Sequence, residues 1–388
     1  MTKKKLLSFI GFCFLVFIWP AKSFTTALQN NYQVYNPTWS VAENGGSMPT
    51  ETLAPYRIIE EKNHKTPLIL IHGTISELRP YCNWKNLLDE LEKPQNKSFL
   101  EQNPVYIFKY ASNTNSWDKT ITDLKKGLLE LLSDYPPQTK FKVIISSLGG
   151  KVFCSALKDT KELDQKFIKG ISLGVPFWGT PLLNKELMID KSQSSNKMIN
   201  CAVSQVTETL FPELDTHLAW LLPLEKTPKT FPSACLPSLR PRLTNYAVFI
   251  DSPLVSKINV SEAEMNEWLI KQINNNDYKH AWDGAMHCKM GWEIEKNFKP
   301  IYLFRFNDGL VPIFSSLWLN INLGKFEGQK ALSPEVLETI KKTDSKARLF
   351  KGLDHSDLTS LIDTSKKHKD LLHNSQDTIG SYILQDLK

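Results

Sequence analysis

The stretch Lys142-Val-Ile-Ile-Ser-Ser-Leu-Gly-Gly-Lys-Val-Phe-Cys154 decides how the chain folds: an apolar run ends in two serines and two glycines, and a helical pattern follows. In a nucleophile elbow, a serine on a strained turn between strand and helix holds its hydroxyl clear of the backbone. The residue two positions after that serine has to be small. Ser147 has Gly149 there, whereas Ser146 would have Leu148. The stretch therefore predicts Ser147 as a nucleophile; the alternative is a Ser-Gly turn that only ends a buried strand.

Strands and helices are predicted to alternate on both sides of this stretch. Apolar runs predict strands at 67–71, 105–110, 141–146, 167–173, 301–306 and 346–351. Helical spacing of apolar residues predicts helices at 82–92, 117–135 and 151–158, and a closing helix from about 370 to 387. This alternation predicts an α/β fold, with a mostly parallel sheet and helices on both faces.

Residues 182–300 interrupt the alternation, because they contain several prolines and no clear strand. They are predicted to be a large cap or lid inserted before the strand that carries the acid, between core segments 24–181 and 301–388. The apolar run 216–224 includes Trp220 and Leu221, which we expect to contact a substrate near the serine. The alternative is that this run forms the internal core of the cap.

The first 23 residues have the pattern of a secretory signal. Three lysines precede an apolar run at 6–19, and Ala21-Lys22-Ser23 places small residues where a signal peptidase reads. We expect cleavage after Ser23 and a secreted or periplasmic mature protein. The alternative is a retained anchor, although the apolar run is shorter than the ~20 residues of a membrane span.

Composition excludes several classes of function. The leader carries four lysines and no acidic residue, so its removal lowers the formal net charge from +6 to +2. The nearly neutral remainder has no arginine-rich tract, which argues against nucleic acid as a partner. No cysteine or histidine spacing resembles a zinc site. Five cysteines remain after the leader, and Cys154 is predicted to be a buried thiol.

A serine nucleophile needs a histidine base and an acid that orients it. In sheets of this kind both follow the serine in sequence, acid first, at the carboxyl ends of later strands. Asp308, followed by Gly309 in a sharp loop, and His355, after the last parallel strand, fit this order. Singly, either residue has an ordinary structural explanation. Together they predict the triad Ser147, Asp308 and His355.

The oxyanion of an acyl-transfer reaction needs N–H donors. Leu148, the residue after the nucleophile, offers one at the start of a helix, whose dipole helps. The loop after the strand that ends at His72-Gly73 offers the second, most simply from Thr74. The alternative is that His72-Gly73 is an ordinary turn at a strand end.

These motifs, spread over residues 67–358, resemble the α/β-hydrolase superfamily and, within it, secreted bacterial triacylglycerol lipases. The matching segments are His72-Gly73, the Ser-x-Gly-Gly of 147–150, the Asn-Asp-Gly-Leu-Val of 307–311 and the His-Ser-Asp-Leu of 355–358. The segment 174–181 resembles the one that follows the next strand in such lipases. Ile145 and Ser146 depart from the pattern, which has a small residue and, in many lipases, a histidine there.

The resemblance implies an exported serine hydrolase that cleaves carboxylic esters, lipid esters above all, without a cofactor. It also implies lipid or ester as the substrate and transient contact with a lipid surface. In some of these lipases an aspartate at the place of Asp357 binds calcium; capping of the following helix is the favoured alternative. A phospholipase A or an acyltransferase would use the same triad. A binding protein on a hydrolase scaffold is the rival from another class.

Overall fold

The computed structural model describes residues 53–56, 61–73, 80–110, 117–158, 160–180, 237–251, 306–319, 332–344, 346–359 and 366–388, and single residues between 264 and 275. The described residues form one nine-stranded sheet in the order β1-β3-β2-β4-β5-β6-β7-β8-β9. Thr74, Trp220, Leu221, the leader and most of 182–300 lie outside these ranges, so the predictions made for them stay predictions.

The strands from β2 to β7 run parallel, and the outer strands are antiparallel to their neighbours. The strands are β1 (Leu53–Pro55), β2 (Leu68–Ile71), β3 (Val105–Phe108), β4 (Phe141–Ser146), β5 (Phe167–Leu173), β6 (Leu243–Phe249), β7 (Arg348–Lys351), β8 (Lys367–Asp370) and β9 (Ser375–Thr378). Every residue of β2 and β3 is buried, as expected for strands covered on both faces.

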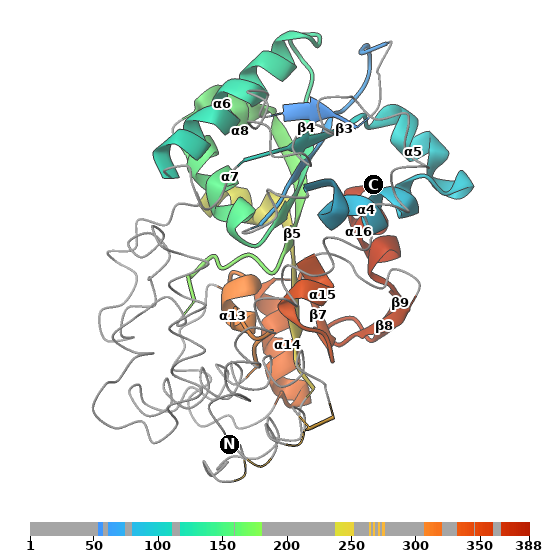
Figure 1. Cartoon of the computed structure of the whole chain (residues 1–388), viewed down its shortest axis with the longest axis vertical. Coiled ribbons are helices and arrows are strands. Elements are labelled where there is room, and N and C mark those ends of the chain that lie inside the picture. The colour runs from blue at the N-terminus through green and yellow to red at the C-terminus, as the bar shows by residue number, and fades with distance from the viewer. Residues whose placement is uncertain are drawn as a thin grey trace.

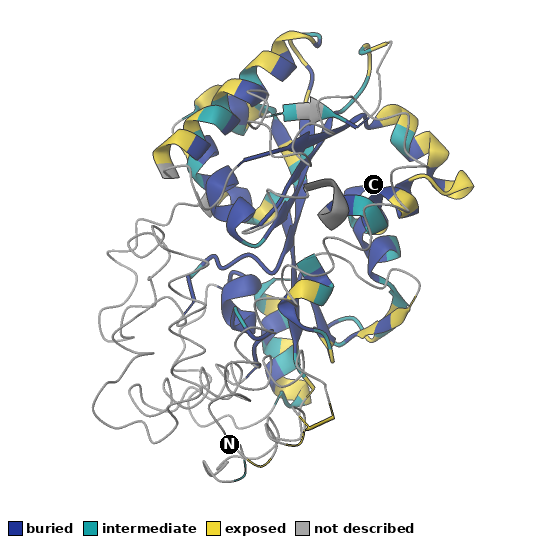
Figure 2. Cartoon of the chain, viewed as in Figure 1, coloured by how far each residue is buried: buried dark blue, intermediate teal, exposed yellow. Residues whose placement is uncertain are grey.

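Helices cover both faces of the sheet, as predicted. The helices are α4 (Pro80–Leu91), α5 (Lys97–Gln102), α6 (Trp117–Ser133), α7 (Leu148–Lys158), α8 (Lys161–Lys166), α13 (Ile313–Ser316), α14 (Pro334–Thr343), α15 (His355–Thr359) and α16 (Ile379–Leu387). Figure 1 shows α6, α7 and α8 on one side of the sheet and α4, α5 and α16 on the other. Figure 2 shows that the central strands are largely buried, whereas the hairpin of β8 and β9 and the outer sides of α5 and α6 carry exposed residues.

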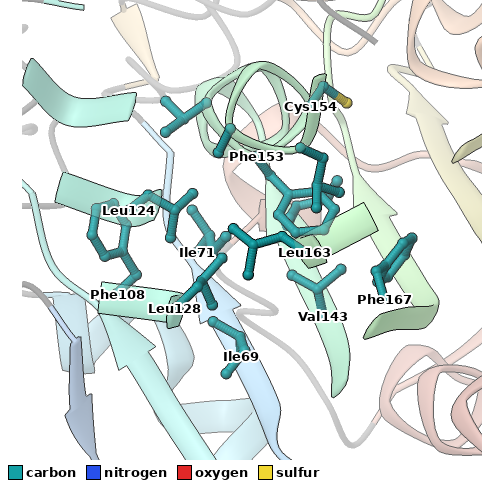
Figure 3. Close-up of a cluster of buried hydrophobic side chains, with 14 of the residues drawn as sticks. Ile69, Ile71, Phe108, Leu124, Leu128, Val143, Phe153, Cys154, Leu163 and Phe167 are labelled. Carbon is teal, nitrogen blue, oxygen red and sulfur yellow. The ribbon is translucent and has the colours of Figure 1, made fainter. Parts of the chain in front are cut away.

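Two apolar clusters, one on each face, hold these layers together. On the α7 face, Val143 of the sheet packs with Leu124 and Leu128 of α6 and with Phe153 of α7. Figure 3 shows these side chains filling the space between the helices and the strands. On the other face, residues of α4 and α16 pack against β2, β3 and β6. The buried thiol of Cys154, as predicted, belongs to the first cluster.

The strand β6 corrects the predicted insertion. Residues 182–300 were expected to lack strands, yet Leu243–Phe249 pairs in parallel with β5 and β7 and is buried along its whole length. The apolar pattern fails here because Asn245 and Tyr246 lie in the core. Their polar groups are paired: Asn245 accepts a 2.7 Å hydrogen bond from the Ser172 hydroxyl, and Tyr246 donates one of 2.6 Å to Asp386.

The end of the chain also differs from the prediction. A helix was expected from about 370, but the hairpin of β8 and β9 comes first and α16 begins only at Ile379. The physical reason is the side chain of Asp370, which is fully buried and accepts hydrogen bonds from the Leu349 and Leu372 N–H groups. A partner on β7 therefore holds this segment in the sheet. No helix in the described part of the chain is long and apolar enough to cross a membrane.

Arg348 fastens the last elements of the chain to the sheet. Its guanidinium donates to Asp386 of α16 at 2.5 and 2.7 Å and to Asp370 of β8 at 3.0 Å. The arginine is 9% exposed at its side chain and Asp370 is not exposed at all. Removal of Asp370 would leave this buried guanidinium with Asp386 alone and would leave the Leu349 and Leu372 N–H groups without their acceptor.

We therefore expect Asp370→Ala to lower the free energy of unfolding by about 3–5 kcal/mol. Asp89→Ala is the matched control, because Asp89 pairs with Lys85 on the exposed side of α4 and such pairs contribute about 0.3–0.5 kcal/mol. Urea denaturation of both variants measures the difference. Equal losses would show that the Arg348 cluster does not hold the hairpin.

Candidate active site

Ser147 lies on the strained turn that the sequence predicted. Its φ is +47°, in the left-handed region that side chains other than glycine rarely adopt. The residue follows β4 directly and α7 begins at Leu148. Its N–H donates to the Leu173 carbonyl at the end of β5, at 2.9 Å. The strained residue is thus held between a strand, its neighbour and a helix.

Two glycines permit the close approach of α7 to the strands. A Cβ on Gly149 would lie 2.3 Å from the His72 carbonyl oxygen, and one on Gly150 would lie 2.4 Å from a methyl group of Val175. Both distances are shorter than any real non-bonded contact, so the small residue predicted at position 149 is required there, and position 150 is equally tight. Ile145, which departs from the family pattern, is fully buried in the apolar cluster on the α7 face.

The three predicted triad residues come together. The Nε2 atom of His355 lies 2.9 Å from the Ser147 hydroxyl oxygen, and its Nδ1 atom lies 2.7 Å from Oδ2 of Asp308. Ser147 is half-buried, whereas Asp308 and His355 are 1% and 7% exposed. Ser146, the competing serine, is the buried last residue of β4.

The loop around Asp308 leaves one carboxylate oxygen for the histidine. Oδ1 accepts the Leu310 and Val311 N–H groups at 2.9 and 2.6 Å, so Oδ2 points to His355. The Asp308 carbonyl accepts the His355 N–H at 2.9 Å, a second tie between the two residues. Gly309 has a φ of +92°, as the predicted sharp loop requires.

The acid lies at the carboxyl end of β6. The Ile250 N–H, one residue past β6, donates to the Asn307 carbonyl at 3.1 Å. The acid was predicted to follow a strand at 301–306; residues 301–305 lie outside the described ranges and Phe306 is in a bend. Asn307, and Asp308 after it, thus lie beside the residue that follows β6.

The surroundings of His355 set its proton affinity. Burial lowers the pKa of His355, but the charge and hydrogen bond of Asp308 and the charge of Asp354 together outweigh burial and raise the pKa above 6.5. A base must be neutral to accept a proton, so this histidine would work at a pH above its raised pKa. Burial without the two carboxylates would lower the pKa of His355 below 6.5.

Asp354 and Asp357 cap α15. Asp354 accepts the Asp357 N–H at 2.7 Å, and Asp357 accepts the Asp354 N–H at 3.2 Å. This reciprocal pair is a capping box at the start of the helix that carries His355. In the described part of the chain no group of three acidic, histidine or cysteine side chains could hold a metal. The geometry favours capping over the calcium site considered for Asp357.

His72 fixes the loop next to the serine. Burial lowers its pKa from 6.5 to about 4, so the ring is neutral at pH 7. Nε2 accepts the Tyr110 N–H at 3.3 Å, which leaves the proton on Nδ1 to donate to the Gly73 carbonyl at 2.7 Å. The Tyr110 ring stacks on the imidazole at 4.2 Å. The predicted turn at His72-Gly73 is therefore a tightly held element.

Two oxyanion donors were predicted. The Leu148 N–H is in the first turn of α7 and so has no partner within the helix. Thr74 lies outside the described residues, but Gly73 before it is next to the nucleophile: a Cβ on Gly73 would lie 2.7 Å from the Ser147 Cβ. The structure thus places the start of this loop beside the serine.

Sequence reasoning gave Gly174 no role, although it lies against the histidine. A Cβ on Gly174 would lie 3.1 Å from both Nδ1 and Cε1 of His355 and 3.5 Å from Oδ2 of Asp308. Its φ is +58°. The signal that was available is a glycine directly after the strand next to the elbow strand.

Comparison with known proteins gives structural likeness alone. No family model and no curated protein matches the chain. Among solved structures, the mature lipase BlEst2 of Bacillus licheniformis is 12% identical with a TM-score of 0.33, over 79% of this chain and 92% of that one. A metagenomic carboxyl esterase is 11% identical with a TM-score of 0.28, over 70% and 65%. A lipase-esterase related protein of Clostridium acetobutylicum is 15% identical with a TM-score of 0.27, over 50% and 78%.

TM-scores and identities this low carry no argument about activity. The fold class is therefore assigned from the architecture of the chain itself. Six parallel strands with helices on both faces, a serine elbow after β4, and an acid and a histidine beside the ends of β6 and β7 form one arrangement. The chain has the α/β-hydrolase fold.

Proposed function

We propose that the protein is a serine hydrolase of carboxylic esters, with lipid esters as substrates. The observation that carries the proposal is the continuous hydrogen-bond chain from Ser147 through His355 to Asp308, with the serine on a strained elbow. Fold alone would not support it, because the same fold hosts many functions.

The reaction follows from this geometry. The Ser147 oxygen attacks the acyl carbon while Nε2 of His355 takes the hydroxyl proton. The tetrahedral intermediate collapses, the C–O bond to the alcohol breaks, and Nε2 returns the proton to the leaving alcohol. Water then attacks the acyl-serine ester in the same way and releases the acid. Asp308 keeps the proton on Nδ1 and stabilises the imidazolium; no cofactor is required.

The oxyanion that forms in each step would be held by the N–H groups of Leu148 and Thr74. In support, α7 directs the positive end of its dipole toward the serine. The Gly73 carbonyl, which shares a peptide group with the Thr74 nitrogen, is held by His72. A donor that is fixed before the reaction stabilises charge without reorganisation.

The lipid specificity, the lid and the location remain part of the proposal. The apolar run 216–224, with Trp220 and Leu221, supports a lid that opens on a lipid surface. The leader at 1–23 supports export to the periplasm or medium. A phospholipase A or an acyltransferase would differ in the groove and in the acceptor alone. A panel of short and long acyl esters, triglyceride and phospholipid separates these substrates.

Replacement of each of the two neighbouring serines, Ser146 and Ser147, tests which one is the nucleophile. Ser147→Ala should abolish ester hydrolysis and labelling by a fluorophosphonate probe, because the hydroxyl bonded to Nε2 of His355 is lost. Ser146→Ala is the control and should keep measurable activity. The opposite result would place the elbow one residue earlier. No labelling of the wild type would favour a binding protein on a hydrolase scaffold.

The acid is tested by Asp308→Asn, which keeps the shape of the side chain but loses its charge. The rate should fall by ~10²–10⁴, because an amide does not stabilise the imidazolium and favours the wrong tautomer. Asp354→Asn is the comparison: it removes the other carboxylate whose charge raises the pKa of His355 but leaves the Asp308 hydrogen bond, so the rate should fall less. Initial rates on a soluble ester decide the matter; a loss below about threefold for Asp308→Asn would move the acid elsewhere.

The lid is tested by Trp220→Ser and Leu221→Ser. Hydrolysis of emulsified long-chain esters should fall far more than that of a soluble butyrate ester, because only the long chain needs an apolar groove. The melting temperature should change little. Parallel losses on both substrates, with a large drop in melting temperature, would instead make this run the core of the cap.

A further inference from the structure

The segment 174–180, between β5 and the undescribed residues after it, contacts all three elements that carry the candidate triad. At its start, Gly174 lies against the His355 ring and near Oδ2 of Asp308. Further along, Val175 lies against Gly150 of α7, the helix that follows Ser147. Six of its seven residues are buried, and Trp178 is partly buried. Residues 174–180 therefore pack against the triad and against the helix of the nucleophile, and are called the wall below.

Lys151 ties this wall to the nucleophile helix. The lysine lies one turn after Ser147 on α7 and is 5% exposed, and its ammonium donates to the Phe177 carbonyl at 2.9 Å. Among the described residues no carboxylate pairs with it. Its hydrogen bond goes to a main-chain carbonyl, so Lys151 fixes the backbone position of Phe177 relative to α7.

Ser315 of α13 ties the wall to the acid loop. Its hydroxyl accepts the Trp178 N–H at 3.0 Å and donates to the Gly179 carbonyl at 2.8 Å, and the residue is not exposed. The Thr180 hydroxyl donates to the Leu310 carbonyl, two residues after Asp308. These bonds fix residues 178–180 relative to the loop that orients the Asp308 carboxylate.

An aromatic contact strengthens the same junction. The Phe177 ring stacks on Trp318 with centroids 4.5 Å apart and planes 8° from parallel. Trp318 has a φ of +49°, and the indole N–H of Trp178 donates to the Leu319 carbonyl at 3.0 Å. Phe177 therefore contacts Lys151 through its carbonyl and the 313–319 segment through its ring.

We propose that residues 174–180 fix the imidazole and carboxylate of the candidate triad relative to Ser147, and that Lys151 and Ser315 are the positioning residues that hold this wall. The proposal rests on the proposed function for its kinetic consequence alone. Neither side chain touches the reacting atoms. A shift of the wall would move the surface against which His355 packs, and a misplacement of about 1 Å in such a site costs up to roughly 100-fold in rate.

The test compares Lys151→Met and Ser315→Ala with two controls that lose the same kind of bond elsewhere. Lys140→Met removes an ammonium that donates to the Gln165 carbonyl at 3.0 Å, and Ser133→Ala removes a hydroxyl that donates to the Glu130 carbonyl at 2.7 Å. Lys151→Arg keeps a charged donor at the key position. For each variant kcat and KM on a soluble ester, the melting temperature and, by NMR, the pKa of His355 are measured.

We expect Lys151→Met and Ser315→Ala to lower kcat roughly 10- to 100-fold with KM changed less than about threefold. Lys151→Arg should recover most of kcat, and both controls should match the wild type. The direction of the His355 pKa separates two causes. A loosened contact with Asp308 lowers this pKa, whereas the mere loss of a nearby positive charge raises it.

A raised pKa of His355 in Lys151→Met, or no change in kcat and pKa in both variants, would overturn the proposal. If Lys151→Met does not fold, Ser315→Ala decides by the same measurements. If the wild type hydrolyses no ester, the proposed function fails; the NMR titration, which needs no substrate, still decides whether the wall positions the histidine.

Discussion

The close contact between the start of α7 and the end of β2 is the constraint on which the rest of the site depends. Gly149 lies so near the His72 carbonyl that no side chain fits between them, and Ser147 takes a left-handed backbone conformation that costs about 1–3 kcal/mol. That cost is tolerated because a buried sheet and the N–H bond to Leu173 hold the turn. The turn fixes the position of the Ser147 hydroxyl, so His355 and Asp308 have to be placed relative to it.

The features that were predicted from sequence are those that depend on local geometry. The pair Gly149-Gly150 identified the elbow, because a sharp turn next to a strand permits nothing larger. Asp308 was found from the loop glycine after it and from its order in the chain. The parallel strands were found because burial on both faces demands continuous apolar runs, as in β2.

The features that were missed depend on partners far away in sequence. β6 contains buried Asn245 and Tyr246, whose partners Ser172 and Asp386 are 73 and 140 residues away. The hairpin before α16 exists because Asp370 bonds to β7. A pattern within a short window contains no information about such pairs. The same holds for Lys151, which looks like a surface residue of a helix until its carbonyl partner is known.

The register of the sheet sets the geometry of the triad. Ser147 follows β4, Gly174 follows β5, Asp308 lies beside the end of β6 and His355 follows β7 by a few residues. These strands are consecutive neighbours, so a slip of one residue in any of them would move its group by about 3.3 Å. Such a shift exceeds the length of either hydrogen bond of His355. A slip would also turn every side chain of that strand to the other face of the sheet, so that residues fitted to one apolar cluster would have to pack in the other.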